Sequence, residues 1–250
     1  MSGNKIPTTT VHQARLQIFQ PTRRPKDCIR EIETSWGSAV VDGKLGQTHA
    51  DMLEAIFYNA ISSKKLENGD VNIIVDPYRV RISVGGGKKY SYSTLIKHSK
   101  EVMKVLIELR TESTGSFVIS HIIQKIIKST VTANNPALNA GGSKNRELWQ
   151  VTISNEFMEL VRNDLPLHYN PLTISSLEKG VSQAVVRLIL THKEQPNGGW
   201  NLDRLLIAVG VDGENSQEMR NRRRDIKKDT SNLSRLGIFI ENSRVKHESV

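Results

Sequence analysis

The stretch 216–236 constrains the fold of this chain more than any other, because a single helix there would carry both an apolar stripe and a basic face. At about 100° per residue, four side chains fall on one narrow stripe that should face a core: Met219, Ile226, Thr230 and Leu233. A different face collects basic and hydroxyl side chains: Arg220, Arg224, Lys227, Lys228, Ser231 and Arg235, with Arg223 at its edge. The stretch holds seven basic and three acidic residues. This bias favours a polyanionic partner over an ordinary solvated face.

The residues around this helix complete a three-helix unit. A first helix is predicted over 182–191, and a second one begins after Asn201, which can cap it, and ends at Gly210. A polar turn over 212–215 leads to the third helix, Gly237 ends that helix, and a short strand follows over 238–240. This order is the helix-turn-helix plan, whose last helix fits the major groove. Arginine can read guanine there with two hydrogen bonds, while lysine mostly neutralises phosphate.

The pattern before position 164 predicts a larger unit. We expect a strand over 29–41 and then a helix that Thr48 can cap, with Asp51 three residues on. The apolar face of that helix comprises Met52, Leu53, Ile56, Phe57, Ala60 and Ile61. Two β-rich runs follow over 71–75 and 78–84. The β-branched residues of 106–132 favour strand over helix, and a second strand over 148–153 follows a polar loop over 134–145. Strand, long loop and strand indicate a hairpin wing, which a short helix over 155–161 closes.

A second basic helix opens at Ser93 in this larger unit. Leu95, Ser99, Val102, Met103 and Leu106 line its predicted inner face. Another face carries Lys97, Lys100 and Lys104 at spacings of three and four. The other candidate contacts are Thr94 and His98 on the same helix, Lys88 and Lys89 before it, and Lys144 and Arg146 in the wing loop. The lysines would meet phosphates, and Thr94 and His98 could reach bases. An ordinary amphipathic helix with a lysine surface remains the alternative.

These patterns predict an α+β fold with two winged-helix, or helix-turn-helix, domains in tandem. We place the first domain at 28–164 and the second at 165–241, after a boundary near Pro166. The stretch 1–27 contains Arg23, Arg24 and Lys26 and is expected to be a flexible basic arm. It is either a disordered tail or a segment that contacts phosphate or the minor groove. The stretch 242–250 is expected to be a C-terminal tail.

Composition limits the classes of protein that remain. The 250 residues are enough for two cores of modest size. The net charge of +9 suits a polyanion, although proteins that bind RNA or membrane surfaces share such an excess. Cys28 is the only cysteine, which favours a reducing compartment. The stretch 1–21 has no long apolar core, and no apolar run approaches the roughly 20 residues of a membrane helix. We therefore expect a soluble cytoplasmic protein with no membrane partner.

The chain lacks the motifs that would indicate an enzyme. Its histidines form neither a His-x-His pair nor a His-Glu-x-x-His motif, and no phosphate-binding P-loop and no serine-nucleophile elbow occur. His168 and Tyr169 are neighbours, as in a nicking enzyme that pairs a metal with a tyrosine nucleophile, but they are better explained by packing at the domain boundary. The sequence therefore predicts no catalytic residues, no metal and no cofactor.

The chain resembles the tandem winged-helix replication initiator proteins of bacterial plasmids. The resemblance covers about 28–240 and rests on order and pattern. The stretches that carry it are TSWG at 34–37, GQTHADMLEAI at 46–56, LWQVTIS at 148–154, RRRDIKK at 222–228 and LSRLG at 233–237. It implies binding of double-stranded DNA at repeated origin sites, local duplex opening and recruitment of host replication proteins such as an initiator or a helicase. It also implies a monomer–dimer switch, with a homodimer through the first domain.

Three other functions stay open at the level of sequence. A winged-helix transcriptional regulator would use the same DNA chemistry. A nicking or strand-transfer enzyme would act on the same substrate, although the missing metal-ligand pairs argue against it. A structural RNA-binding protein would share the basic charge.

Overall fold

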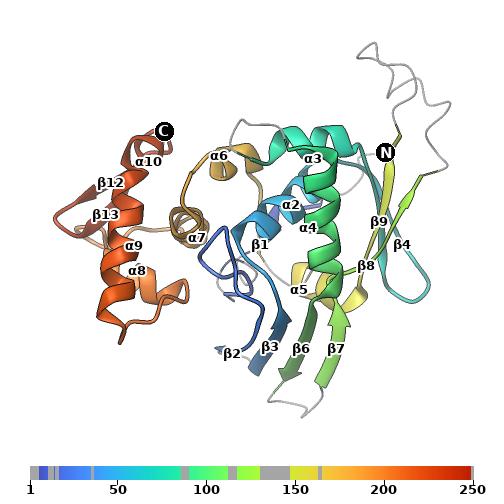
Figure 1. The fold of residues 1–250 in the computed structure, drawn as a ribbon, viewed down its shortest axis with the longest axis horizontal. Helices are drawn as coiled ribbons and strands as arrows, with labels where there is room; N and C mark the ends of the chain where they lie inside the picture. Colours follow the sequence, from blue (N-terminus) through green and yellow to red (C-terminus); the bar gives the residue numbers. More distant parts are fainter. Residues whose placement is uncertain are drawn as a thin grey trace.

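The computed structural model describes residues 6–10, 14, 17–34, 37–85, 90–111, 117–129, 147–162 and 165–248. Two buried hydrophobic clusters lie within them, one drawn from residues 18–158 and the other from residues 174–245. Figure 1 shows the first cluster's elements on the right and the second cluster's elements on the left. The mixture of helices with several antiparallel sheets agrees with the predicted α+β class.

Among the described residues, the first unit contains two four-stranded sheets and four helices. One sheet has the order β2-β3-β6-β7, from β2 (Cys28–Thr34), β3 (Gly37–Gly43), β6 (Leu106–Thr111) and β7 (Phe117–His121). The other has the order β4-β5-β9-β8, from β4 (Ala60–Lys65), β5 (Val71–Val75), β8 (Ile123–Lys128) and β9 (Trp149–Ile153). The helices are α2 (Gln47–Tyr58), α3 (Pro77–Ser83), α4 (Tyr92–Lys104) and α5 (Asn155–Arg162).

The second unit is a group of helices with a three-stranded sheet. Its sheet has the order β11-β13-β12, from β11 (Trp200–Asn201), β12 (Ile238–Glu241) and β13 (Arg244–His247). Its helices are α6 (Pro171–Ser175), α7 (Gly180–Ile189), α8 (Leu202–Ala208), α9 (Ser216–Lys228) and α10 (Thr230–Ser234). A further pair, β1 (Thr9–Thr10) with β10 (Pro166–Leu167), joins the N-terminal stretch to the segment between the units.

The two units repeat one order of elements. In the first, once β4, β6 and β7 are set aside, α2 is followed by β5, α3, α4, β8 and β9, and the strands β5-β9-β8 lie in the order first, last, middle. In the second, α7 is followed by β11, α8, α9, the short helix α10, β12 and β13, and the strands β11-β13-β12 lie in the same order. Helices α4 and α9 therefore occupy equivalent places, α4 before the pair β8-β9 and α9 before the pair β12-β13, with β6 and β7 inserted after α4 and the short helix α10 after α9.

Several boundaries in the first unit differ from the sequence prediction. The stretch 78–84 is mostly the helix α3, because Asp76 caps it by accepting the Tyr78 N–H and Pro77 stands at the first helical position. Gly46, not Thr48, is the N-cap of α2. The apolar face of that helix ends by Tyr58, so Ala60 and Ile61 belong to β4. The single strand expected over 29–41 is two antiparallel strands, β2 and β3. The predicted strands over 71–75 and 148–153 and the helix over 155–161 are confirmed.

The long C-terminal helix is broken at Asp229. This fully buried carboxylate accepts the backbone N–H groups of Glu178 and Lys179, at 3.0 and 2.8 Å, and so joins the end of α9 to the start of α7. The chain then turns into α10, and Thr230, predicted on the inner stripe, is exposed. The predicted tail over 242–250 is also wrong in part, because β13 pairs with both β11 and β12.

Residues 17–27 of the predicted flexible arm are packed between the two units. Ile18 is fully buried, and Arg30 donates from its guanidinium to the carbonyls of residues 17 and 18. A Cβ on Gly46 or on Gly180 would lie 2.5 Å from the backbone of Thr22, so glycine permits this close approach in both units. Hydrophobic burial and these contacts override the expectation of a free arm.

Candidate nucleic-acid interface

Helix α9 presents a basic face because its apolar residues are anchored. Asn215 caps the helix by accepting the Glu218 N–H, and Met219 and Ile226 are buried in the second core. The opposite side chains are exposed: Arg220, Arg224, Lys227 and Lys228 on α9, followed by Ser231 on α10 and Arg235 just after it. The structure thus brings six of the seven residues predicted for this face to the surface of the second unit.

Arg223 differs from the other members of the predicted face. Its guanidinium donates to both carboxylate oxygens of Asp203 in α8, at 2.6 and 2.8 Å. These hydrogen bonds raise the pKa of Arg223. The pair fixes α9 against α8 and uses the two nitrogens that would otherwise bind a base or a phosphate. Arg223 is therefore a bracing residue of the helix in this structure.

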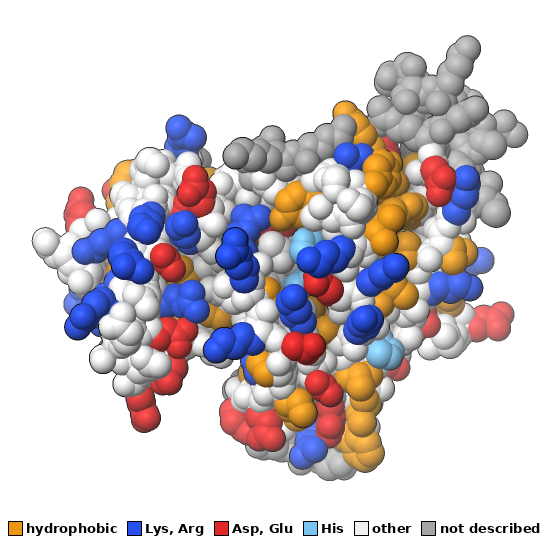
Figure 2. All heavy atoms as spheres, viewed as in Figure 1, with side chains coloured by type: hydrophobic (Ala, Val, Ile, Leu, Met, Phe, Trp, Pro, Cys, Tyr) orange, Lys and Arg blue, Asp and Glu red, His pale blue; other side chains and the backbone are white. Residues whose placement is uncertain are grey.

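Helix α4 presents the second basic face. Ser91 caps it by accepting the Thr94 N–H, and Leu95, Ser99 and Val102 are buried against the first core. Lys97, Lys100 and Lys104 are exposed, as the sequence predicts. Figure 2 shows Lys and Arg side chains over α9 and over α4 on the same face of the molecule. The two basic helices can therefore approach one extended polyanion from the same side.

Thr94 and His98 do not join this exposed face. The Thr94 hydroxyl lies 2.8 Å from the Ser91 hydroxyl as part of the helix cap, and His98 Nδ1 lies 2.8 Å from Glu101 Oε2. Both side chains are half-buried and take part in these local hydrogen bonds, and base reading by them stays a prediction. The predicted contacts Lys88, Lys89, Lys144 and Arg146 lie outside the described residues. Among the described residues, Lys125 and Lys128 are exposed on β8.

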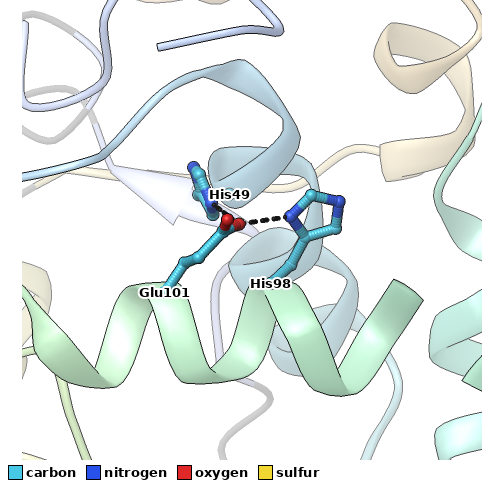
Figure 3. A group of neighbouring side chains, drawn as sticks. All are labelled: His49, His98 and Glu101. Atoms are coloured by element: carbon cyan, nitrogen blue, oxygen red, sulfur yellow. Dashed lines mark hydrogen bonds and ion pairs between the residues drawn. The ribbon is translucent and has the colours of Figure 1, made fainter. Parts of the chain in front are cut away.

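A cluster of His49, His98 and Glu101 braces α4 against α2 (Figure 3). Both imidazoles lie within 2.9 Å of Glu101 Oε2, and the Gly46 N–H donates to His49 Nδ1 at 3.0 Å. Since Nδ1 accepts this bond, Nε2 of His49 carries the proton that it donates to Glu101. A metal at Nε2 would need that lone pair, so the bond from Gly46 favours a positioning network over a metal centre. Sequence reasoning missed the cluster because its members are far apart in the chain.

The charge state of this network depends on its burial. His49 is only 1% exposed, and burial lowers the pKa of its imidazole despite the bond to Glu101. Burial also opposes the ionisation of Glu101, but hydrogen bonds from His49 and His98 outweigh it and hold the pKa of Glu101 down to about 2. Glu101 is therefore a carboxylate at neutral pH, and it receives a proton from each ring.

We predict that this cluster makes the fold acid-sensitive. Because the folded pKa of Glu101 lies below its ordinary value of 4.5, the stabilisation is complete above that value and declines as the pH falls towards about 2. Glu101→Gln should lower the free energy of unfolding at pH 7 by about 1–2 kcal/mol and flatten its decline below pH 5. Urea unfolding from pH 7 to pH 3 measures both. Glu67→Gln, in an exposed turn, is the control, and an unchanged acid profile in Glu101→Gln would refute this role.

The second network missed by the sequence analysis joins the two units. Arg187 of α7 is 5% exposed and donates to Asp51 Oδ1 at 2.6 Å and to Glu54 Oε1 at 2.7 Å, both in α2. Its third nitrogen donates to Gln47 Oε1 at 2.6 Å, and the Tyr169 hydroxyl donates to Glu54. Burial opposes the charge on Arg187, yet the two carboxylates raise its pKa well above the ordinary value.

This network fixes the position of α9 relative to α4. Figure 1 shows α7 between α9 and α2, and α4 packs on α2. Arg23 adds a second tie, since it donates to the Leu177 carbonyl at 3.0 Å and to the Tyr90 hydroxyl at 3.0 Å. The sequence analysis interpreted Asp51 only as part of a helix cap. Its observed role, an ion pair with a residue 136 positions away, leaves no local signal.

The comparisons with known proteins bear on the fold. No family model and no curated protein matches the chain. A crystal structure of domains 2 and 3 of RctB matches with a TM-score of 0.60 and 13% identity, covering 94% of this chain and 95% of that one. A second crystal structure of RctB domains 2–3 matches with a TM-score of 0.54 and 13% identity, covering 91% of each chain. No helix among the described residues is long and apolar enough to cross a membrane.

Proposed function

We propose that this chain binds double-stranded DNA sequence-specifically at a plasmid replication origin and initiates replication there without a catalytic step of its own. One observation carries the proposal: two units that share a core order of helices and strands each present one helix, α4 or α9, whose exposed face is basic. The repeated order of helices and strands supports the proposal that the two units are winged-helix domains in tandem. Helices in this position of such a domain enter the major groove.

The charge of the interface supports DNA as the partner. Arg220, Arg224, Lys227 and Lys228 on α9 and three lysines on α4 are exposed, and the chain carries a net charge of +9. Phosphate neutralisation by such side chains supplies most of the non-specific affinity for a duplex. Lys26, which is exposed at the end of the N-terminal segment, lines one groove with Arg224 and with Arg222, whose guanidinium pairs with Glu218 and Asp225.

The similarity of fold to RctB, a replication initiator, supports the choice of initiation among DNA-binding functions. In this proposal the protein binds repeated sites at the origin and recruits host replication proteins. A homodimer through the first unit fits the edge strand β7, where Phe117, Val118 and Ile119 are exposed. A winged-helix transcriptional regulator, the alternative function, would use the same two helices but would need no repeated sites.

Binding to randomised DNA tests the proposal. The full chain should enrich a defined sequence from a library of random duplexes, and a fluorescent copy of the enriched duplex should bind more tightly than a scrambled one. The logarithm of the affinity should fall linearly with the logarithm of the salt concentration, with a slope of about −0.9 for each neutralised phosphate. Failure to enrich any sequence, or equal binding to duplex RNA, would contradict the proposal.

A further inference from the structure

The exposed face of α4 contains an apolar side chain among its cations. Ser93, Ile96, Lys97, Lys100 and Lys104 are the exposed residues from the second position of the helix onward, and they recur at spacings of three and four. Ile96 is 42% exposed, although its neighbour Leu95 is buried in the core. Ile96 therefore stands in the N-terminal half of the basic face, directly beside Lys97 and one turn before Lys100.

A second exposed apolar group adjoins this position. Tyr92 lies one turn before Ile96 and is 44% exposed, and the guanidinium carbon of Arg81 lies 4.1 Å from the centre of its ring. Single exposed apolar side chains are common on folded proteins and need no explanation. Here, however, two of them lie on the N-terminal half of the helix, which is the part that contacts base edges when such a helix enters the major groove.

The lysines next to Ile96 indicate whether this side chain contacts a protein or DNA. An apolar protein surface that covered Ile96 would also take Lys97 and Lys100 out of water, which is unfavourable without acidic partners. In the major groove the same lysines meet phosphates, while an apolar side chain meets the C5-methyl group of thymine, the apolar group on a base edge. The pattern of one isoleucine between cations therefore matches a DNA groove better than an apolar protein surface.

We propose that Ile96 contacts the C5-methyl group of a thymine and so selects a T·A pair within the DNA site read by α4. This inference rests on the proposed function and deepens it, because it assigns a base preference to a helix whose lysines supply affinity without sequence information. The sequence analysis did not single out Ile96. It placed base reading on Thr94 and His98, which the structure uses in the helix cap and in the Glu101 network.

Replacing thymine by deoxyuridine tests the contact, since it removes only the methyl group. The probe is the duplex that the full chain enriches from a random library, with each thymine exchanged in turn. At one position the exchange should weaken binding about fourfold, the factor expected for one buried apolar carbon. Ile96→Ser should lose this sensitivity at that position alone. Ile29→Ser, a control at a 67% exposed isoleucine on β2, should retain it.

The outcomes separate this inference from the proposed function. A chain that enriches a duplex but tolerates deoxyuridine at every thymine binds DNA without reading a methyl group, and the inference is overturned alone. Equal deoxyuridine sensitivity in the unsubstituted chain and in Ile96→Ser assigns the methyl contact to another residue and also overturns it. A chain that enriches no duplex contradicts the proposed function and the inference together. Circular dichroism of each variant checks that α4 is intact.

Discussion

Replacing Arg187 by methionine should lower the free energy of unfolding by about 3–5 kcal/mol. Arg187 is the only cation that contacts Asp51 and Glu54 among the described hydrogen bonds and ion pairs, and both carboxylates are at most 1% exposed. Methionine keeps much of the side-chain volume but leaves two buried acids without a counter-charge. Such an uncompensated charge costs more than the ion pair itself contributes. Urea unfolding at pH 7, followed by circular dichroism, measures the loss.

Two further variants give this prediction its controls. Arg223→Met removes an arginine–carboxylate pair whose side chains are 42% and 40% exposed, and it should cost only about 0–1 kcal/mol. Adding Asp51→Asn and Glu54→Gln to Arg187→Met should restore part of the lost stability, since no orphaned charge remains. A loss below about 1 kcal/mol in Arg187→Met would mean that the units are held together mainly by other contacts.

The double change Arg224→Ala with Lys228→Ala should weaken binding to the enriched duplex by more than about tenfold. Both side chains are exposed on α9, away from the buried Met219 and Ile226, so the fold should remain intact. An arginine that reads a base is worth about 1–3 kcal/mol on the specific site. A lysine that contacts phosphate weakens all duplexes alike and accounts for about one unit of salt slope. The double variant should therefore lose specificity as well as affinity.

Fluorescence anisotropy with the enriched and scrambled duplexes at two salt concentrations measures this effect. The matched control removes the same charge elsewhere, through Arg110→Ala with Lys193→Ala, two exposed residues on β6 and in the loop after α7. We expect the control to change affinity by less than about threefold, because distant exposed charges are screened by salt. Equal losses in the two double variants would show that net charge, and not the α9 face, governs binding.

Local patterns in the sequence predict much of the second unit. Asn201 has a capping side chain directly before an apolar helix, and the stripe of Met219, Ile226 and Leu233 fixes the inner face of the next helix. These signals depend on neighbours three to seven positions apart, so they are visible without the fold. The break at Asp229 is not visible in this way, because its partners, the N–H groups of Glu178 and Lys179, lie about 50 positions earlier.

The parts of the site that the sequence could not predict depend on long-range pairing. Arg187 lies within an apolar helix, and only the fold shows that it faces Asp51 and Glu54. The sequence analysis placed His98 among the base-reading residues, but its ring hydrogen-bonds to Glu101 and contacts the ring of His49, and no local pattern indicates these partners. The helix α3 is a different case, since Asp76 and Pro77 are a recognisable helix start that the β-rich composition of 78–84 obscured.

A hydroxyl-radical footprint on the enriched duplex tests the central claim most directly, because the claim is that one protein places α4 and α9 on the same DNA. We expect two protected tracts whose centres lie about one helical turn, or about 10 base pairs, apart. The variant Arg224→Ala with Lys228→Ala should lose one tract, and the triple variant Lys97→Ala, Lys100→Ala and Lys104→Ala should lose the other. A single tract that both variants weaken equally would contradict the account.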